Sequence, residues 1–145
     1  RWLDYMKEQG VYDNTRIIIV ADHGENLSQM DELIFEDLGF DAEHANPILM
    51  VKDFNSTGYS TSDEFMTNAD TPYISLNGVI NDPVNPFTNK PIAPYDKSGD
   101  HHIFYSDISN PEYYTGTQFN DPDGYWVSVR ENIWDRNNWK AYEPG

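Results

Sequence analysis

The chain has 145 residues, 38% hydrophobic and 14% aromatic, which is enough apolar material to bury a core and argues against wholesale disorder. Its 25 acidic and 9 basic residues give a formal net charge of −16, which repels phosphate backbones and argues against nucleic acid as a partner. The absence of cysteine excludes disulfides, thiolate catalysis and thiolate zinc sites.

No apolar run approaches the roughly 20 residues of a membrane span, and no signal peptide is visible. The chain opens at Arg1 without an initiator methionine, within a segment that has a helical pattern. We therefore expect a piece of a longer protein, a piece that is soluble by itself. Missing targeting signals then say little about the location of that parent protein.

Residues 1–21 predict a helix, a turn and a buried strand. Trp2 and Met6 lie at helical spacing within residues 1–10, and Gly10 is a typical stop. Residues 16–21 include a continuous β-branched run, typical of a strand buried on both faces in a parallel sheet with helices on each side. Helix, short turn and buried strand together are the second half of an α/β crossover.

Shorter elements are predicted in the middle of the chain. Residues 30–38 predict a short acidic helix with its apolar side chains inward, and Gly39 ends it. Residues 47–51 predict a second short buried strand. Thr71 is favoured as a helix N-cap and Pro72 at the first helical position. Irregular segments are predicted at 53–62, and at 83–94, which contains four prolines.

The last third of the chain changes character. Residues 102–105 and 125–129 are aromatic and partly alternating, which predicts strands of a small antiparallel sheet. A polar loop is predicted over 107–124. The pattern as a whole indicates an α/β fold, with a sheet-and-helix part over 1–95 and a small antiparallel β subdomain over 96–145 packed on it.

The sharpest feature is the sequence Asp22-His23-Gly24-Glu25, directly after the apolar run. In open α/β sheets, ligands bind beyond the carboxyl ends of the strands. A carboxylate and an imidazole at that place suit Zn²⁺, Mn²⁺ or a similar divalent ion. The alternative is a structural turn in which Asp22 accepts backbone N–H bonds and His23 is solvated. A second Asp-His pair lies at 100–101, so the dipeptide alone is weak evidence for a metal site. The metal hypothesis therefore depends on the position of Asp22 and His23 directly after a strand.

Residues 12–25, which read YDNTRIIIVADHGE, resemble the C-terminal metal-binding motif of sulfatases and their relatives in the alkaline phosphatase superfamily. Those relatives include the lipoteichoic-acid synthase and phosphoglycerol transferase group. Residues 44–52 resemble the strand that follows in that family, residues 70–79 its next helix, and residues 85–92 the loop after that helix. The similarity covers roughly residues 1–92 in order.

The resemblance implies a partial alkaline-phosphatase-like parallel sheet with flanking helices. It also implies that Asp22 and His23 bind a catalytic divalent metal (Mn, Zn, Mg or Ca) that polarises a sulfate or phosphate ester. The nucleophile of this family, a Thr, Ser or formylglycine, lies far upstream of the motif, and nothing in this chain matches it. We therefore expect an inactive C-terminal fragment that binds metal weakly or not at all. Its full-length parent would be a hydrolase or transferase at the extracellular face of a bacterial membrane.

Two further residues are candidates at the same site. His44 precedes the second strand and is predicted to contact substrate or a second metal, with a plain loop histidine as the alternative. Glu25 is predicted to orient His23 by contacting the imidazole without touching the metal, with a solvated acid at a helix start as the alternative. His101 and His102 begin a strand, which favours a structural role for them.

Two other function classes stay open. An acidic domain rich in Asn, Asp, Tyr and Trp is also typical of a carbohydrate- or Ca²⁺-binding module without catalysis, with Ca²⁺ held by loop 120–124. A purely structural domain with no site is the third hypothesis. If strands upstream of this chain are missing, an apolar edge or face is exposed, and we expect self-association through it.

Overall fold

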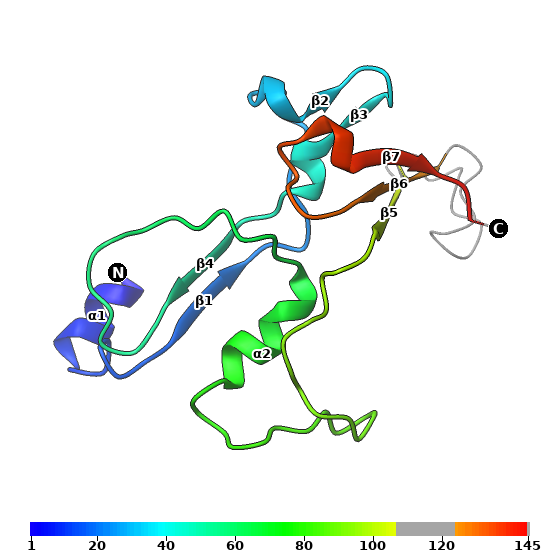
Figure 1. Ribbon diagram of the computed structural model, residues 1–145. Coiled ribbons are helices and arrows are strands. Elements are labelled where there is room, and N and C mark those ends of the chain that lie inside the picture. Colours follow the sequence, from blue (N-terminus) through cyan, green and yellow to red (C-terminus); the bar gives the residue numbers. More distant parts are fainter. Residues whose placement is uncertain (107–123, 145) are drawn as a thin grey trace, which may run out of the picture. The chain divides into compact units, whose positions relative to one another are not determined.

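The computed structural model describes residues 1–106 and 124–144, and these fall into two units (Figure 1). The first unit comprises residues 1–24 and 46–95, and the second comprises residues 25–45 and 96–145. Each is mixed or mainly β, with small antiparallel sheets and few helices, so the α/β class holds in this coarse form. Residues 25–45, which the sequence placed with residues 1–95, group with the C-terminal segment.

The first unit is built around a two-stranded ribbon. Helix α1 (Trp2–Glu8) precedes strand β1 (Ile17–Val20), which pairs antiparallel with strand β4 (Leu49–Lys52). A 3-10 helix (Asn68–Asp70) leads directly into helix α2 (Thr71–Leu76), which has Pro72 in its first turn. The N-cap is Asp70, one residue before the predicted Thr71. Every one of these elements is short, so packing between them is limited.

The parallel sheet expected around β1 is not among the described residues, where β1 pairs with β4 alone and in antiparallel register. A parallel connection needs a crossover of a dozen or more residues, usually a helix. The segment between β1 and β4 forms no such helix, because residues 34–41 fold into a hairpin. The chain therefore returns beside β1 in the opposite direction.

The acidic helix predicted over residues 30–38 is wrong. One 3-10 turn (Asp31–Leu33) is followed by an antiparallel hairpin of strands β2 (Ile34–Phe35) and β3 (Phe40–Asp41). The apolar residues here follow a period of two, because Leu33 and Phe35 are buried while Ile34 between them is only half-buried. Gly39 ends the turn with φ +60°, a conformation that glycine adopts without strain.

The predicted C-terminal antiparallel sheet is confirmed. It has three strands in the order β5 (His101–Tyr105), β6 (Tyr125–Val129) and β7 (Trp139–Tyr142). The central strand β6 pairs with both neighbours, with Val129 opposite His101 on one side and Trp139 on the other. The predicted loop at 107–124 lies outside the described residues apart from its last position.

The second unit has an apolar core of its own. The hairpin and the three-stranded sheet meet at the indole ring of Trp139, whose centroid lies 5.4 Å from that of Phe35 and 5.5 Å from that of Phe40. The indole N–H of Trp139 donates to the carbonyl of Ile133 at 2.8 Å, so its polar atom is satisfied. The buried apolar side chains of this unit are Leu33, Phe35, Phe40, Ala42, Val127, Val129 and Trp139.

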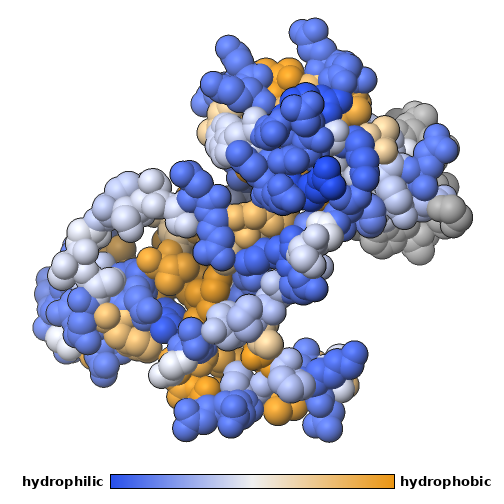
Figure 2. All heavy atoms as spheres, viewed as in Figure 1, coloured by the Kyte–Doolittle hydropathy of each residue, from blue (hydrophilic) through white to orange (hydrophobic). Residues whose placement is uncertain are grey.

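The first unit buries far less. Met6 is its one buried apolar side chain among the described residues. Along the ribbon, Ile19 and Met50 on one face and Val20 and Val51 on the other are between 41% and 52% exposed. Figure 2 shows hydrophobic side chains uncovered where Figure 1 places β1 and β4. Two-stranded ribbons are marginal in water, so this unit depends on other contacts. Among the described residues, no helix is long and apolar enough to span a bilayer.

Because the second unit has an apolar core and the first buries little, replacing a tryptophan with alanine should affect the stability of the two units differently. Trp139→Ala should destabilise the second unit by about 3–5 kcal/mol, because it removes the ring on which the hairpin and the sheet pack. Trp2→Ala, at a side chain that is 71% exposed, should change stability by less than about 0.5 kcal/mol. Urea unfolding followed at amide resonances of β6 for Trp139→Ala, and of β1 for Trp2→Ala, measures the two effects. Equal effects of the two variants would contradict this account of the core.

Candidate metal centre

Asp22 and His23 lie in the turn that ends β1. The pairing of β1 with β4 continues one residue beyond the strand, where the Ala21 N–H donates to the Ile48 carbonyl at 3.1 Å. The chain then turns, and the His23 N–H donates to Oδ1 of Asp22 at 3.1 Å. This local bond is the contact that the structural-turn alternative predicts, and it occupies one of the two carboxylate oxygens.

The imidazole of His23 is oriented by its own chain. Its Nδ1 lies 2.6 Å from the carbonyl oxygen of Gly24. Because a carbonyl only accepts hydrogen bonds, Nδ1 is the donor in this contact, and in the neutral imidazole Nε2 is then the nitrogen without a proton. A metal-ligating histidine commonly binds through one nitrogen while the other donates to a carbonyl or carboxylate. The tautomer indicated here is the one that a metal at Nε2 requires.

The two candidate donor atoms lie close together at the surface. Nε2 of His23 is 3.9 Å from Oδ2 of Asp22, and the two side chains are 55% and 90% exposed. Two ligands of a tetrahedral ion at about 2.0–2.1 Å each are roughly 3.3 Å apart, so the separation of 3.9 Å is wider than a shared ion requires. The types of donor fit a divalent ion.

Two donors are too few to complete a metal site. No group of three or more His, Cys, Asp or Glu side chains is arranged to hold an ion in the part of the chain that the structure describes. Structural and catalytic zinc sites use at least three protein ligands. Asp22 and His23 are only two donors, so any ion held there would need further ligands from water or from other groups.

Asn68 holds the backbone of this turn. Its Nδ2 donates to the carbonyl oxygens of both Ala21 and Asp22, each at 3.1 Å. The sequence did not single out Asn68, because it lies 46 residues from Asp22, and the capping box of its 3-10 turn involves Thr67 and Asp70 and not Asn68 itself. Asn68 could have been predicted only from a sequence signal that connects position 68 with positions 21 and 22.

The opposite end of β1 is held by Arg16, whose side chain is 13% exposed. Its Nε donates to Asp53 at 2.9 Å, across from it beside β4, and its Nη1 donates to the carbonyls of Ile74 and Asn77 at 2.7 Å each. Those carbonyls belong to the C-terminal end of α2, where a helix leaves its acceptors unpaired. β1 is thus tied at one end by Arg16 and at the other by Asn68.

Lys52 makes a third set of polar contacts around the β1–β4 ribbon. Its Nζ donates to the carbonyls of Tyr12, of Asp13 at 3.3 Å and of Thr15 at 3.0 Å, and it lies 4.4 Å from the centroid of the Tyr12 ring. The turn that leads into β1 is therefore pinned to the end of β4. A lysine held by three carbonyls is a poor anion receptor, which argues against substrate binding by Lys52.

His44 and Glu25 lie in the second unit. His44 is in a 3-10 turn (Ala42–Ala45), and its ring meets Tyr105 edge-on with centroids 5.1 Å apart. Glu25 is exposed, and its Oε1 accepts the Asn26 N–H at 3.3 Å. The predictions that His44 contacts substrate and that Glu25 orients His23 stay predictions.

Glu43 is a buried acid that the sequence did not reveal. It is 6% exposed, and its carboxylate accepts the N–H groups of Leu27 at 3.0 Å, of Gln29 at 2.7 Å and of Met30. Three backbone donors satisfy a buried carboxylate and fix the loop that follows Glu25. We assign Glu43 a structural role.

The second Asp-His pair is engaged in other contacts. The Asp100 carboxylate is bonded to the ammonium group of Lys140, which lowers the pKa of Asp100 below its usual value. The neighbouring His102 stacks on Tyr142, with centroids 3.8 Å apart and planes inclined by 17°. The stacking on Tyr142 supports the structural role predicted for His102.

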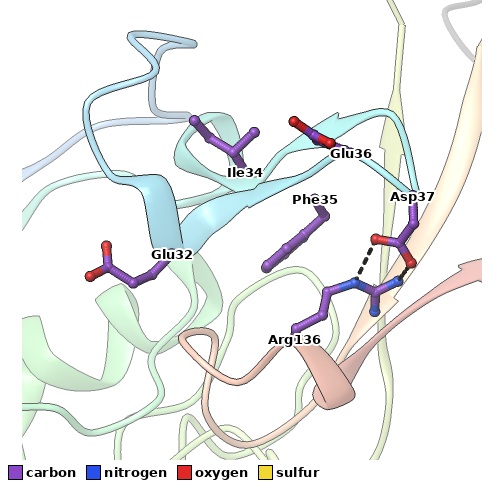
Figure 3. Close-up of a pocket in the computed structure, with 6 residues that line it drawn as sticks. All are labelled: Glu32, Ile34, Phe35, Glu36, Asp37 and Arg136. Carbon is purple, nitrogen blue, oxygen red and sulfur yellow. Dashed lines mark hydrogen bonds and ion pairs between the residues drawn. The ribbon is translucent and has the colours of Figure 1, made fainter.

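An open hollow of about 700 Å³ lies beside the β2–β3 hairpin (Figure 3). Its one cation, Arg136, points at Asp37, bonds it through Nε at 3.0 Å, and donates to the Trp139 carbonyl at 2.6 Å. The same guanidinium lies 5.3 Å from the centroid of Phe35. Because that cation is committed, the hollow does not suit an anionic ester. It is lined by Glu32, Ile34, Phe35, Glu36, Asp37 and Arg136.

No family model, curated protein or solved structure matches this chain.

The contact between Arg16 and Asp53 predicts that the stability of the first unit falls at acid pH. The hydrogen bond from Arg16, and then that from the Phe54 N–H, hold the pKa of Asp53 below its usual value. A carboxyl with a depressed folded-state pKa contributes stability above its unfolded value of about 3.9, and that contribution is lost as the pH falls through the folded value. Asp53→Asn should therefore lower stability at pH 6 and reduce its decline below about pH 4.

Urea midpoints at pH 6 and pH 3, read from amide resonances of β1, test this prediction. Asp63→Asn, at an exposed acid in the loop after β4, is the matched control. The same pH dependence in wild type and Asp53→Asn would show that the Arg16 contact carries none of the acid sensitivity.

Proposed function

We propose that this chain is the C-terminal part of a metal-dependent sulfatase-like enzyme, with Asp22 and His23 as two ligands of a catalytic divalent ion. The parent enzyme hydrolyses or transfers a sulfate or phosphate ester, at the extracellular face of a bacterial membrane. The observation that carries the proposal is the turn after β1, where the His23 tautomer and the nearby Asp22 carboxylate present two donor atoms 3.9 Å apart. The ordered resemblance over residues 1–92 adds the reaction class.

The charge of the chain supports a metal. With a formal net charge of −16, the protein repels an anionic ester unless a cation lies between the two. The two basic side chains closest to the ribbon, Arg16 and Lys52, are both engaged with carbonyls or a carboxylate. A divalent ion at Asp22 and His23 supplies the missing positive charge.

The roles of the chain's own residues follow from their positions. When bound, a divalent ion of this kind stabilises negative charge on the ester oxygen. Asp22 contributes an anionic oxygen and His23 contributes Nε2, while Gly24 orients the imidazole through its carbonyl. The proposal places the nucleophile and the remaining ligands outside this chain, so the chain alone is expected to lack activity.

Metal binding by the chain tests the proposal. In an amide spectrum, substoichiometric Mn²⁺ should broaden the resonances of Asp22, His23 and Gly24 first, since paramagnetic broadening detects even a weak site. Asp22→Asn combined with His23→Gln should abolish this broadening. Competition with diamagnetic Zn²⁺ or Mg²⁺ then ranks the ions.

The second Asp-His pair provides a matched control. Asp100→Asn combined with His101→Gln changes the same two residue types where the acid is already bonded to Lys140. This double variant should leave broadening at residues 22–24 unchanged. Broadening that is spread over the acidic surface, or that survives the change at 22 and 23, would defeat the proposal.

The exposed ribbon supports the view that further strands belong beside it. The residues of β1 are apolar on both faces, and only Met6 in this unit is buried among the apolar side chains described. A strand of this composition is typical of the interior of a larger sheet. Without its neighbours, the same surface favours self-association.

Self-association should depend on the ribbon. Ile19 and Met50 face each other across the two strands and are 52% and 46% exposed, so lysine at either position places a charge in the contact. Ile19→Lys or Met50→Lys should shift sedimentation equilibrium towards monomer. Phe87→Lys, at a side chain that is 94% exposed in the 83–94 segment, should have no such effect. A wild-type monomer at high concentration would contradict the prediction.

A further inference from the structure

One side-chain amide bridges the two peptide groups that flank Asp22. The Ala21 carbonyl belongs to the peptide plane before Asp22, and the Asp22 carbonyl belongs to the plane after it. Nδ2 of Asn68 is 3.1 Å from both oxygens. An amide nitrogen carries two hydrogens, so it has one donor for each carbonyl. Both partners are acceptors, which also decides which way the Asn68 amide faces.

This bridge restricts the backbone of Asp22. Each residue has two soft torsions, φ and ψ, between rigid peptide planes. A group that holds the plane on each side fixes both torsions at once, and with them the direction in which Cβ leaves the chain. The carboxylate of Asp22 is 90% exposed, so no packing of the side chain supplies that restraint.

Asn68 is itself held in place. The carboxylate of Asp70, which is 2% exposed, accepts the Thr67 N–H at 2.9 Å, and the Thr67 hydroxyl lies 3.4 Å from the same oxygen. In return, the Asp70 N–H donates to the Thr67 carbonyl at 3.0 Å. These bonds close the turn in which Asn68 is the first residue, immediately before α2. The amide thus projects from a closed turn.

We propose that Asn68 is a positioning residue for the metal ligands, which it serves by fixing the backbone on both sides of Asp22. This inference rests on the proposed function, since it concerns the same ion. Asn68 contacts neither the carboxylate nor the imidazole in the bonds described above. Its contribution is to keep Asp22 and His23 close together.

The test compares Asn68→Ala and Asn68→Leu with wild type, since leucine keeps the bulk and removes both donors. Mn²⁺ affinity, from broadening at His23 and Gly24, should fall about tenfold in each variant, as for other residues that support metal ligands. In the metal-free chain, hydrogen exchange at the Ala21 and His23 amides should accelerate. Both amides donate hydrogen bonds in the turn that Asn68 holds.

Asn138→Ala is the matched control, because Nδ2 of Asn138 also donates to a backbone carbonyl, that of Asn132, at 3.0 Å. It should leave both readouts at residues 21–24 unchanged. Unchanged Mn²⁺ affinity in folded Asn68→Ala and Asn68→Leu would overturn the inference. If wild type shows no Mn²⁺ broadening, the proposed function fails, and the exchange rates alone decide whether Asn68 fixes the turn.

Discussion

The first unit depends most on the hydrogen bonds that the guanidinium group of Arg16 donates. This unit buries one apolar side chain among those described, Met6, so polar contacts hold its segments together. Arg16 joins the start of β1, the residue after β4 and the C-terminal carbonyls of α2 in a single set of bonds. Charge-assisted bonds of this kind are stronger than neutral ones, and Arg16 is sheltered from water while Asp53 is half exposed. The turn with Asp22 lies at the other end of the strand that these bonds anchor.

Local patterns were enough to predict some elements and not others. A strand at the β-branched run before Asp22, a helix at Thr71-Pro72 and the aromatic strands of the C-terminal sheet each depend on preferences within a few residues, and each of these elements formed. The burial of the β-branched run on both faces was wrong, because Ile19 and Val20 are 52% and 41% exposed. The parallel sheet was not predictable from the run itself, because strand direction depends on what connects the strands. The 30–38 helix failed because a period of two and a period of 3.6 are hard to separate in a short apolar segment.

The sequence likewise predicted some residues of the candidate site and missed others. Asp22 and His23 were found because they follow a strand directly, and the structure shows them side by side. Asn68 and Glu43 were missed because their importance comes from backbone groups far away in the sequence or in an irregular loop. The two Asp-His pairs are identical as dipeptides and differ in their surroundings. Asp100 is neutralised by Lys140, while Asp22 is exposed beside an oriented imidazole.

The packing of the β2–β3 hairpin on β7 has a consequence for synthesis of the chain on the ribosome. Asp37 and Arg136, which join these two parts, are 99 residues apart. At about 5–20 residues per second, the hairpin is synthesised roughly 5–20 s before Trp139. During that interval Phe35 and Phe40 lack the ring that covers them in the folded unit. The nascent hairpin therefore exposes these two aromatic rings until β7 is made, and the second unit completes its core only after its last strand is available.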